Sequence, residues 1–162
     1  MATTTPAWLK IIGLIAIIVV VVFLVALLVL AVLSYRAERR ADNTAFHNGK
    51  YPDAPLDGAY DGKFDGKTDW LGKKFDATNS KGINIFSGDK ERFVFTTERA
   101  KTLKGDQEVL HINYNQPGNP FWLRFIVDEL VQTDAGKYQG KVFIKIGPLD
   151  FTLTYFKLSE RQ

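Results

Sequence analysis

The feature that most constrains this chain is an uninterrupted apolar run near its N-terminus. Residues 11–33 carry no charged or polar side chain, and 19 of these 23 residues are Leu, Ile, Val or Phe. As an α-helix rising about 1.5 Å per residue, the run reaches about 34 Å, enough to cross a hydrocarbon core of about 30 Å. At roughly −0.3 to −0.6 kcal/mol per large apolar residue, its insertion into lipid is favourable by about 6 to 11 kcal/mol. We therefore predict a transmembrane helix over residues 11–35, after an N-terminal tail of residues 1–10.

A cleaved signal peptide is the alternative for an apolar segment in this position. Its apolar region runs about 7–15 residues and ends in a small-x-small cleavage site. Here the run is longer, and Leu33-Ser34-Tyr35-Arg36 ends it with bulk and charge. The sequence therefore favours a retained, single-pass signal anchor.

Aromatic and basic side chains flank the run, as is typical of the two membrane–water interfaces. Three arginines follow it, whereas a single lysine, Lys10, precedes it. The positive-inside rule therefore favours a cytoplasmic position for the C-terminal part of the chain, with the opposite side as the alternative. The predicted membrane-interface residues are Trp8, Tyr35, Arg36, Arg39 and Arg40.

Two further segments follow the predicted helix. Residues 36–55 start with helix-forming residues and end with Asn48-Gly49 and Pro52 to Pro55, which indicates a short helical extension and a linker. Residues 56–160 form the predicted soluble domain. From residue 50 onward, 17 Lys and Arg balance 16 Asp and Glu, with the signs interspersed. This balance argues against a nucleic-acid-binding surface, and the absence of cysteine excludes disulfides and thiolate metal sites.

Period-two alternation, the pattern of half-buried strands, recurs throughout the soluble domain. From Asp57 to Trp70, aromatic side chains and glycines fall on one face, and aspartates and lysines fall largely on the other. Glycines between inward aromatics suit a strand that bends tightly around a core. Further strands, separated by turn-forming residues, are predicted at 82–86, 91–97, 109–114, 121–132, 141–146 and 151–158. The fold class is therefore mainly β, an antiparallel meander of about seven or eight strands, closed or nearly closed into a barrel.

In general layout, with its glycine-punctuated first strand and its meander, the domain resembles the lipocalin or calycin type of barrel. The resemblance is at the level of the fold, and the short Gly-x-Trp signature of lipocalins is absent. Ten of the 12 phenylalanines and two of the three tryptophans lie in this part of the chain. Such rings either fill a small core or line an apolar cavity.

No motif with a plausible catalytic geometry is present, so we predict a protein that is not an enzyme and has no cofactor or metal site. His111 shares a strand face with Asn113 and Asn115, which predicts a surface position. The regularly spaced aspartates of residues 57–69 alternate with lysines along an extended strand, which favours a solvated face over a calcium site. Asp128 and Glu129 are neighbours on a predicted strand, so they point to opposite faces and do not form an acid/base pair. An exposed position is predicted for this carboxylate pair.

Aromatic residues remain as candidates for contact with a ligand or partner. Trp122 and Arg124 follow a Pro-rich loop and are suited to a recognition tip. The favoured interpretation is a Trp that plugs the barrel end, with its Arg extending outward. The predicted contact residues are Trp122, Arg124, Trp70, Tyr60 and Phe64. Two functions are compatible with these features. The preferred one is a non-catalytic structural or interaction module, held at the lipid bilayer to contact a larger membrane protein complex. The alternative is a small barrel that binds an apolar small molecule such as a lipid.

Overall fold

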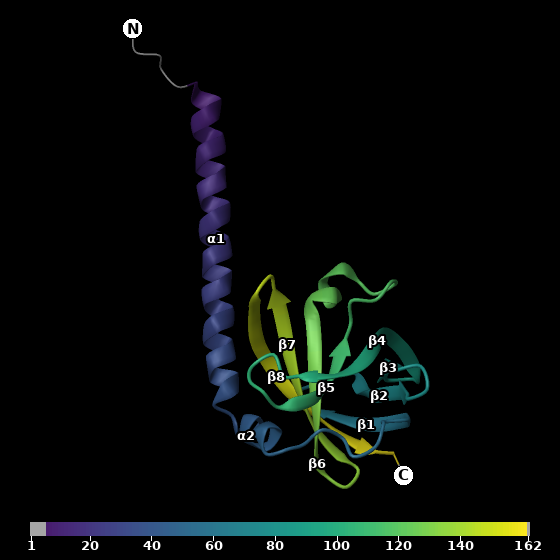
Figure 1. Ribbon diagram of the computed structural model, residues 1–162. Coiled ribbons are helices and arrows are strands. Elements are labelled where there is room, and N and C mark those ends of the chain that lie inside the picture. Colours follow the sequence, from purple (N-terminus) through teal and green to yellow (C-terminus); the bar gives the residue numbers. More distant parts are fainter. Residues whose placement is uncertain (1–5, 162) are drawn as a thin grey trace.

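The computed structural model describes residues 6–161 as a long helix standing beside a small β-barrel (Figure 1). Helix α1 spans Ala7–Glu38 and the short helix α2 spans Ala41–His47. The backbone at Arg40 is extended, with φ −76° and ψ 153°, so it separates the two helices. α2 therefore leaves the end of α1 at a sharp angle and leads the chain under the barrel (Figure 1).

Eight antiparallel strands follow in chain order, and the first pairs with the last to close the barrel. This confirms the predicted fold class of one N-terminal apolar helix followed by an antiparallel meander, and the barrel is fully closed. The strands are β1 (Gly58–Phe64), β2 (Trp70–Asp76), β3 (Lys81–Phe86), β4 (Lys90–Lys101), β5 (Glu108–Asn113), β6 (Ile126–Asp134), β7 (Lys137–Ile146) and β8 (Leu149–Glu160).

Within residues 6–161, α1 is the one helix long and apolar enough to cross a membrane. Its large apolar side chains from Trp8 to Leu33 are mostly exposed, and its two buried residues, Ser34 and Ala37, both lie near its C-terminal end. Long apolar surfaces that face water are strongly unfavourable. The exposure of α1 is therefore that of a helix suited to lipid.

Two stretches of the predicted strand pattern are wrong in detail. The alternating residues 57–70 form two strands, because Gly66 takes a φ of 111° and the chain turns there before β2. The first five residues of the predicted strand 121–132 form the 3-10 helix η1 (Phe121–Phe125) instead. Pro120 precedes η1, and its fixed φ favours the first turn of a helix over a strand interior.

A polar seam joins the end of α1 to the outer wall of the barrel. The hydroxyl of Ser34 accepts a hydrogen bond from the backbone N–H of Thr152 over 2.9 Å. The carboxylate of Glu38 accepts from Lys141 Nζ at 2.9 Å and from Lys104 Nζ at 3.2 Å, as well as from the Thr152 hydroxyl. Burial lowers the pKa of Lys141, and the Glu38 carboxylate opposes that shift. These contacts hold the barrel in one orientation relative to α1.

An apolar cluster lies beside this seam. It contains Ala37 of α1, Phe46 of α2 and three side chains of the barrel wall, Val109, Val131 and Tyr155. Phe46, Val109 and Val131 are fully buried. The two helices therefore pack against the outside of the barrel, and its interior remains separate from them.

Candidate functional site

The barrel interior is filled at one end and hollow at the other. Aromatic rings pack edge to face in the filled end, with Tyr60 against Phe75 at 5.4 Å and against Tyr138 at 5.6 Å between centroids. The other end carries the β1–β2, β3–β4, β5–β6 and β7–β8 connections, and we call it the open end. A pocket of about 200 Å³ begins there and reaches the middle of the barrel.

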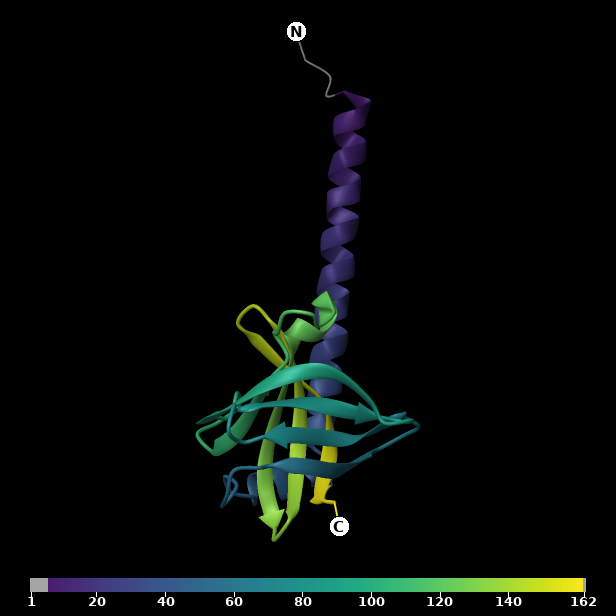
Figure 2. The same cartoon turned by 90° about the vertical axis from the view of Figure 1, so that its right-hand side faces the viewer.

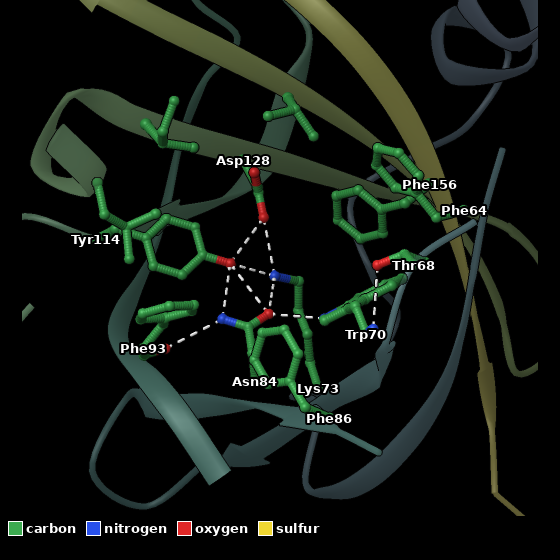
Figure 3. Close-up of a pocket in the computed structure, with 13 residues that line it drawn as sticks. Phe64, Thr68, Trp70, Lys73, Asn84, Phe86, Phe93, Tyr114, Asp128 and Phe156 are labelled. Carbon is green, nitrogen blue, oxygen red and sulfur yellow. Dashed lines mark hydrogen bonds and ion pairs between the residues drawn. The ribbon is translucent and has the colours of Figure 1, made fainter. Parts of the chain in front are cut away.

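The walls of this pocket are mostly apolar. Leu123 of η1 is buried at its mouth, and Phe64 lies edge to face with Trp70 at 6.4 Å between ring centroids. The complete lining is Phe64, Thr68, Trp70, Lys73, Asn84, Phe86, Phe93, Tyr114, Leu123, Ile126, Asp128, Val142 and Phe156. Figure 3 shows four of its polar members, Lys73, Asn84, Tyr114 and Asp128, meeting between the aromatic rings, while Thr68 lies apart beside Trp70.

That meeting point is a buried, hydrogen-bonded network, which we call the polar floor. It consists of Lys73, Asn84, Tyr114 and Asp128, from four different parts of the barrel (Figure 3). Lys73 Nζ donates to Asp128 Oδ2 at 2.8 Å, to Asn84 Oδ1 at 3.0 Å and to the Tyr114 hydroxyl. The Tyr114 hydroxyl donates to Asp128 Oδ2 at 2.9 Å. The ammonium group of Lys73 thus has a partner for each of its N–H bonds, and Asp128 Oδ2 accepts from both Lys73 and Tyr114.

Aromatic rings surround the ammonium group of Lys73. Its Nζ lies 5.0 Å from the ring centroids of Tyr114 and Phe156, 5.1 Å from that of Phe95 and 5.7 Å from that of Trp70. Ring faces attract a cation that has lost its water. Burial nevertheless lowers the pKa of Lys73, while Asp128 opposes the shift. Burial also raises the pKa of Tyr114 well above its usual value, and the Asp128 charge adds to that effect.

Two bulges place residues of this site. In β2 the register shifts between Trp70 and Gly72, so Leu71 is unpaired and lies outside at 41 % exposure. Trp70 and Lys73 can therefore both face inward although they are three residues apart. In β4 the register shift leaves Phe93 unpaired, with a φ of 66° that is unusual for an aromatic residue. The Asn84 amide donates to the Phe93 carbonyl at 3.0 Å and so ties this bulge to the polar floor.

The structure brings some of the predicted contact residues together. Trp70 and Phe64 line the pocket. Trp122 lies at the pocket mouth, where its ring meets that of Phe93 edge to face at 6.1 Å between centroids. Tyr60 lies in the filled end, and Arg124 is exposed on η1. The favoured interpretation, in which Trp122 plugs the barrel end, is wrong, because Trp122 is 60 % exposed and its neighbour Leu123 is the residue buried at the pocket mouth.

Among the predicted interface residues, Trp8 and Tyr35 are exposed. Arg36 and Arg39 are exposed too, and Arg39 stacks over the Tyr35 ring at 4.6 Å. Arg40 turns toward the barrel, where it pairs with Asp42 at 2.8 Å and with Asp65.

The polar floor was not predicted from the sequence. The expectation that Asp128 is exposed is wrong, since it is 4 % exposed and faces the interior. A usable signal was present for Asn84, a lone amide between Ile83 and Ile85 in an otherwise apolar strand. For Lys73 the signal was the pair Lys73-Lys74, because alternation forces one of two neighbours inward.

Glu129 is also buried, against expectation, but on the outer side of the wall. It points away from Asp128, as predicted for strand neighbours, and a loop covers it. The Thr102 hydroxyl and the Leu103 backbone N–H donate to its carboxylate, the latter at 2.6 Å. Burial raises the pKa of Glu129 above 4.5. His111, predicted at the surface, is half-buried on this outer side, with its side chain 14 % exposed, and burial lowers its pKa.

The raised pKa of Glu129 predicts a pH effect on stability. In the range just above pH 4.5 the folded chain holds a proton on Glu129 that the unfolded chain has released, so stability falls as pH rises through that range. In the variant Glu129→Gln this contribution is absent at every pH. We expect the wild type to lose stability relative to the variant as the pH rises above 4.5, as measured by urea unfolding of both full-length chains in micelles over a series of pH values. A difference that does not change with pH would contradict the assignment.

Comparisons with known proteins add little to this description. No family model and no curated protein matches the sequence. A crystal structure of a protein from Thermomonospora curvata is similar at 14 % identity and a TM-score of 0.46, over 70 % of this chain and 80 % of that one. The fold of this chain therefore rests on its own strand pairing.

Proposed function

We propose that this chain is a membrane-anchored, non-catalytic barrel that binds a small amphipathic molecule. The observation that carries the proposal is the pocket of about 200 Å³, apolar in its walls and charged at its floor. Ligand sites combine these two properties, since apolar walls supply affinity and a few polar groups fix orientation. The volume is below the usual range for whole drug-sized ligands and suits one chain end or ring of a larger molecule.

The hydrogen bonds of the polar floor define the polar group that such a ligand would carry. Lys73 has three N–H bonds, and all three are directed to Asp128, Asn84 and Tyr114. Both amide hydrogens of Asn84 are used as well, on the Phe93 carbonyl and the Tyr114 hydroxyl. Within residues 6–161, no donor reaches Asp128 Oδ1, although Asp128 lines the pocket. The polar floor therefore favours a ligand that donates, such as an alcohol or amine, over a carboxylate or phosphate.

The same geometry supports binding over catalysis. A nucleophilic lysine needs a free amine with an accessible lone pair. Lys73 is instead in an ion pair, caged by rings and 2 % exposed. Tyr114 as a base is disfavoured because its pKa is raised well above the usual value. The polar floor acts in this proposal as a fixed hydrogen-bonding surface.

The proposal is tested with 1-decanol as the probe and the full-length chain in lipid nanodiscs. Binding to the folded state raises the midpoint of thermal unfolding, and a hundredfold excess over Kd stabilises by about 2.7 kcal/mol. We expect a concentration-dependent rise for decanol and a much smaller one for decanoate, whose carboxylate meets no free donor.

The control is a matched pair of variants. Val142→Phe places a ring in the pocket, whereas Val94→Phe adds the same ring to an outer position that is 40 % exposed. We expect the decanol effect to be lost in the first variant and kept in the second. Equal responses of the two variants would reflect a change in the bilayer and would refute the pocket as a binding site.

The preferred sequence-based function, an interaction module for a larger membrane complex, stays a second proposal. One observation favours it, namely that Phe121 and Trp122 at the open end are 74 % and 60 % exposed. Pull-down of the full-length chain from mild detergent tests it, and recovery of this chain alone would count against it. The cytoplasmic position of the barrel stays a prediction from the arginines after α1, and protease accessibility in intact cells tests it.

A further inference from the structure

The open end of the barrel carries a group of exposed apolar side chains. Phe121, Trp122 and Phe125 of η1 are all exposed. Leu149, next to the β7–β8 turn, is 45 % exposed. We call these four residues the apolar tip. Apolar groups of this size on a small domain indicate contact with another apolar phase.

The apolar tip lies beside the apolar part of α1. Both views show η1 and the β7–β8 turn rising alongside α1, level with a part of the helix well before its C-terminal end (Figures 1 and 2). The barrel thus overlaps the lower part of the apolar segment. A bilayer that covered this segment would reach the open end of the barrel.

The rise per residue of strand and helix places the apolar tip at the same level along α1. Thr152 of β8 is bonded to Ser34 of α1, and Leu149 lies three residues closer to the turn. Three strand residues rise about 10 Å, the rise of about seven helical residues, which places Leu149 near Leu27. Leu27 and Leu30 are indeed half-buried, whereas the residues around them are exposed. Both leucines belong to the apolar run that ends at Leu33.

The orientation is fixed by the polar seam. Glu38 binds both Lys141 and Lys104, and Ser34 binds both Thr152 and Lys104. Because Lys141 is fully buried, a swing of the barrel about the end of α1 would separate this lysine from Glu38, its half-buried ion-pair partner. The apolar tip therefore cannot move away from the bilayer without a loss of these contacts.

We propose that the apolar tip inserts into the interface of the same bilayer that α1 spans. This inference rests on the anchoring of α1 in the proposed function, but it does not require a ligand in the pocket. Trp122 and the phenylalanines supply rings of the kind that concentrate at the boundary between headgroups and acyl chains. Arg124, exposed on η1 between Trp122 and Phe125, is placed to contact lipid headgroups.

The chain has no native cysteine, so single labels can be placed at chosen depths. Phe121→Cys and Leu149→Cys probe the apolar tip, and Val22→Cys probes the middle of α1. Ala135→Cys probes the exposed β6–β7 turn at the opposite end of the barrel. Each full-length variant carries the environment-sensitive fluorophore NBD in phosphatidylcholine vesicles that contain lipids with a nitroxide on the acyl chain. We expect the nitroxide to quench both tip labels several-fold more than the Ala135 label.

The four labels separate the possible outcomes. If the Val22 label is quenched but the tip labels are quenched no more than the Ala135 label, the inference is overturned and the anchoring of α1 stands. No quenching at Val22 would overturn the anchor and the inference together. As an independent check, Phe121→Asp should reduce quenching of the Leu149 label several-fold, whereas Thr78→Asp, at the opposite end, should leave it unchanged. An unchanged signal in Phe121→Asp would count against insertion of η1.

Discussion

The variant Lys73→Met is expected to lower the free energy of unfolding by about 3–5 kcal/mol. It removes one partner of a buried ion pair and leaves the carboxylate of Asp128, 4 % exposed, with the Tyr114 hydroxyl as its remaining partner in the polar floor. An uncompensated buried charge is far more unfavourable than the loss of a surface pair. Urea unfolding of the full-length chain in micelles measures the effect.

Two variants control this result. Lys74, the next residue, points outward and pairs with Glu91 at 3.0 Å, with the two side chains 53 % and 45 % exposed. Lys74→Met should therefore change stability by only about 0–1 kcal/mol. The double variant Lys73→Met/Asp128→Asn removes both charges and should recover most of the loss. A double variant as unstable as Lys73→Met alone would show that the ion pair is not the source of the effect.

Gly72→Ala is expected to destabilise the barrel by at least about 4 kcal/mol, among the largest effects of single substitutions. Gly72 has a φ of 147°, and a Cβ there would lie far closer to the carbonyl oxygen of Tyr60 than the 3.0 Å that real Cβ atoms keep. The obstacle is backbone of the neighbouring strand, so no side-chain movement relieves it. Strands β1 and β2, in which Gly72 lies opposite Asp61 and Lys73 opposite Tyr60, would have to separate there.

Gly118→Ala is the matched control. Gly118 also has a positive φ, 88°, but a Cβ there meets nothing within 4 Å. Gly118→Ala should lower the free energy of unfolding by about 1–2 kcal/mol, which is the strain of a side chain in the left-handed conformation. Thermal unfolding of both variants separates strain from steric overlap. Equal losses in the two variants would mean that close approach of β1 and β2 at Gly72 is not required.

The elements that depend on local pattern could be predicted from the sequence. The apolar run predicts a long helix such as α1, because the thickness of a bilayer sets the number of consecutive apolar residues that a spanning helix needs. That number can be counted directly in the sequence. Alternation correctly placed Leu110, Ile112 and Tyr114 on one face, and all three are buried. In a regular strand successive side chains point to opposite faces of the sheet, so the face of each residue can be counted from its neighbour.

The polar floor could not be predicted because it depends on events outside the local pattern. The bulge at Leu71 reverses the alternation, so counting from Trp70 places Lys73 on the wrong face. Whether Asp128 or Glu129 faces inward depends on the register of β6 with β5 and β7, which pairs residues far apart in sequence. The seam has the same origin, since Glu38 and Lys141 are separated by 103 positions.

Closure of the barrel affects how copies of this chain would interact in the plane of a membrane. A chain tethered as proposed meets copies of itself in two dimensions, where encounters are frequent. An open meander would present two strands with unpaired N–H and C=O groups, which are templates for chain-to-chain polymerisation. Here β1 and β8 pair with each other from Tyr60–Glu160 to Phe64–Phe156. The domain is therefore suited to high surface density, because copies that collide meet side chains and find no β-edge to extend.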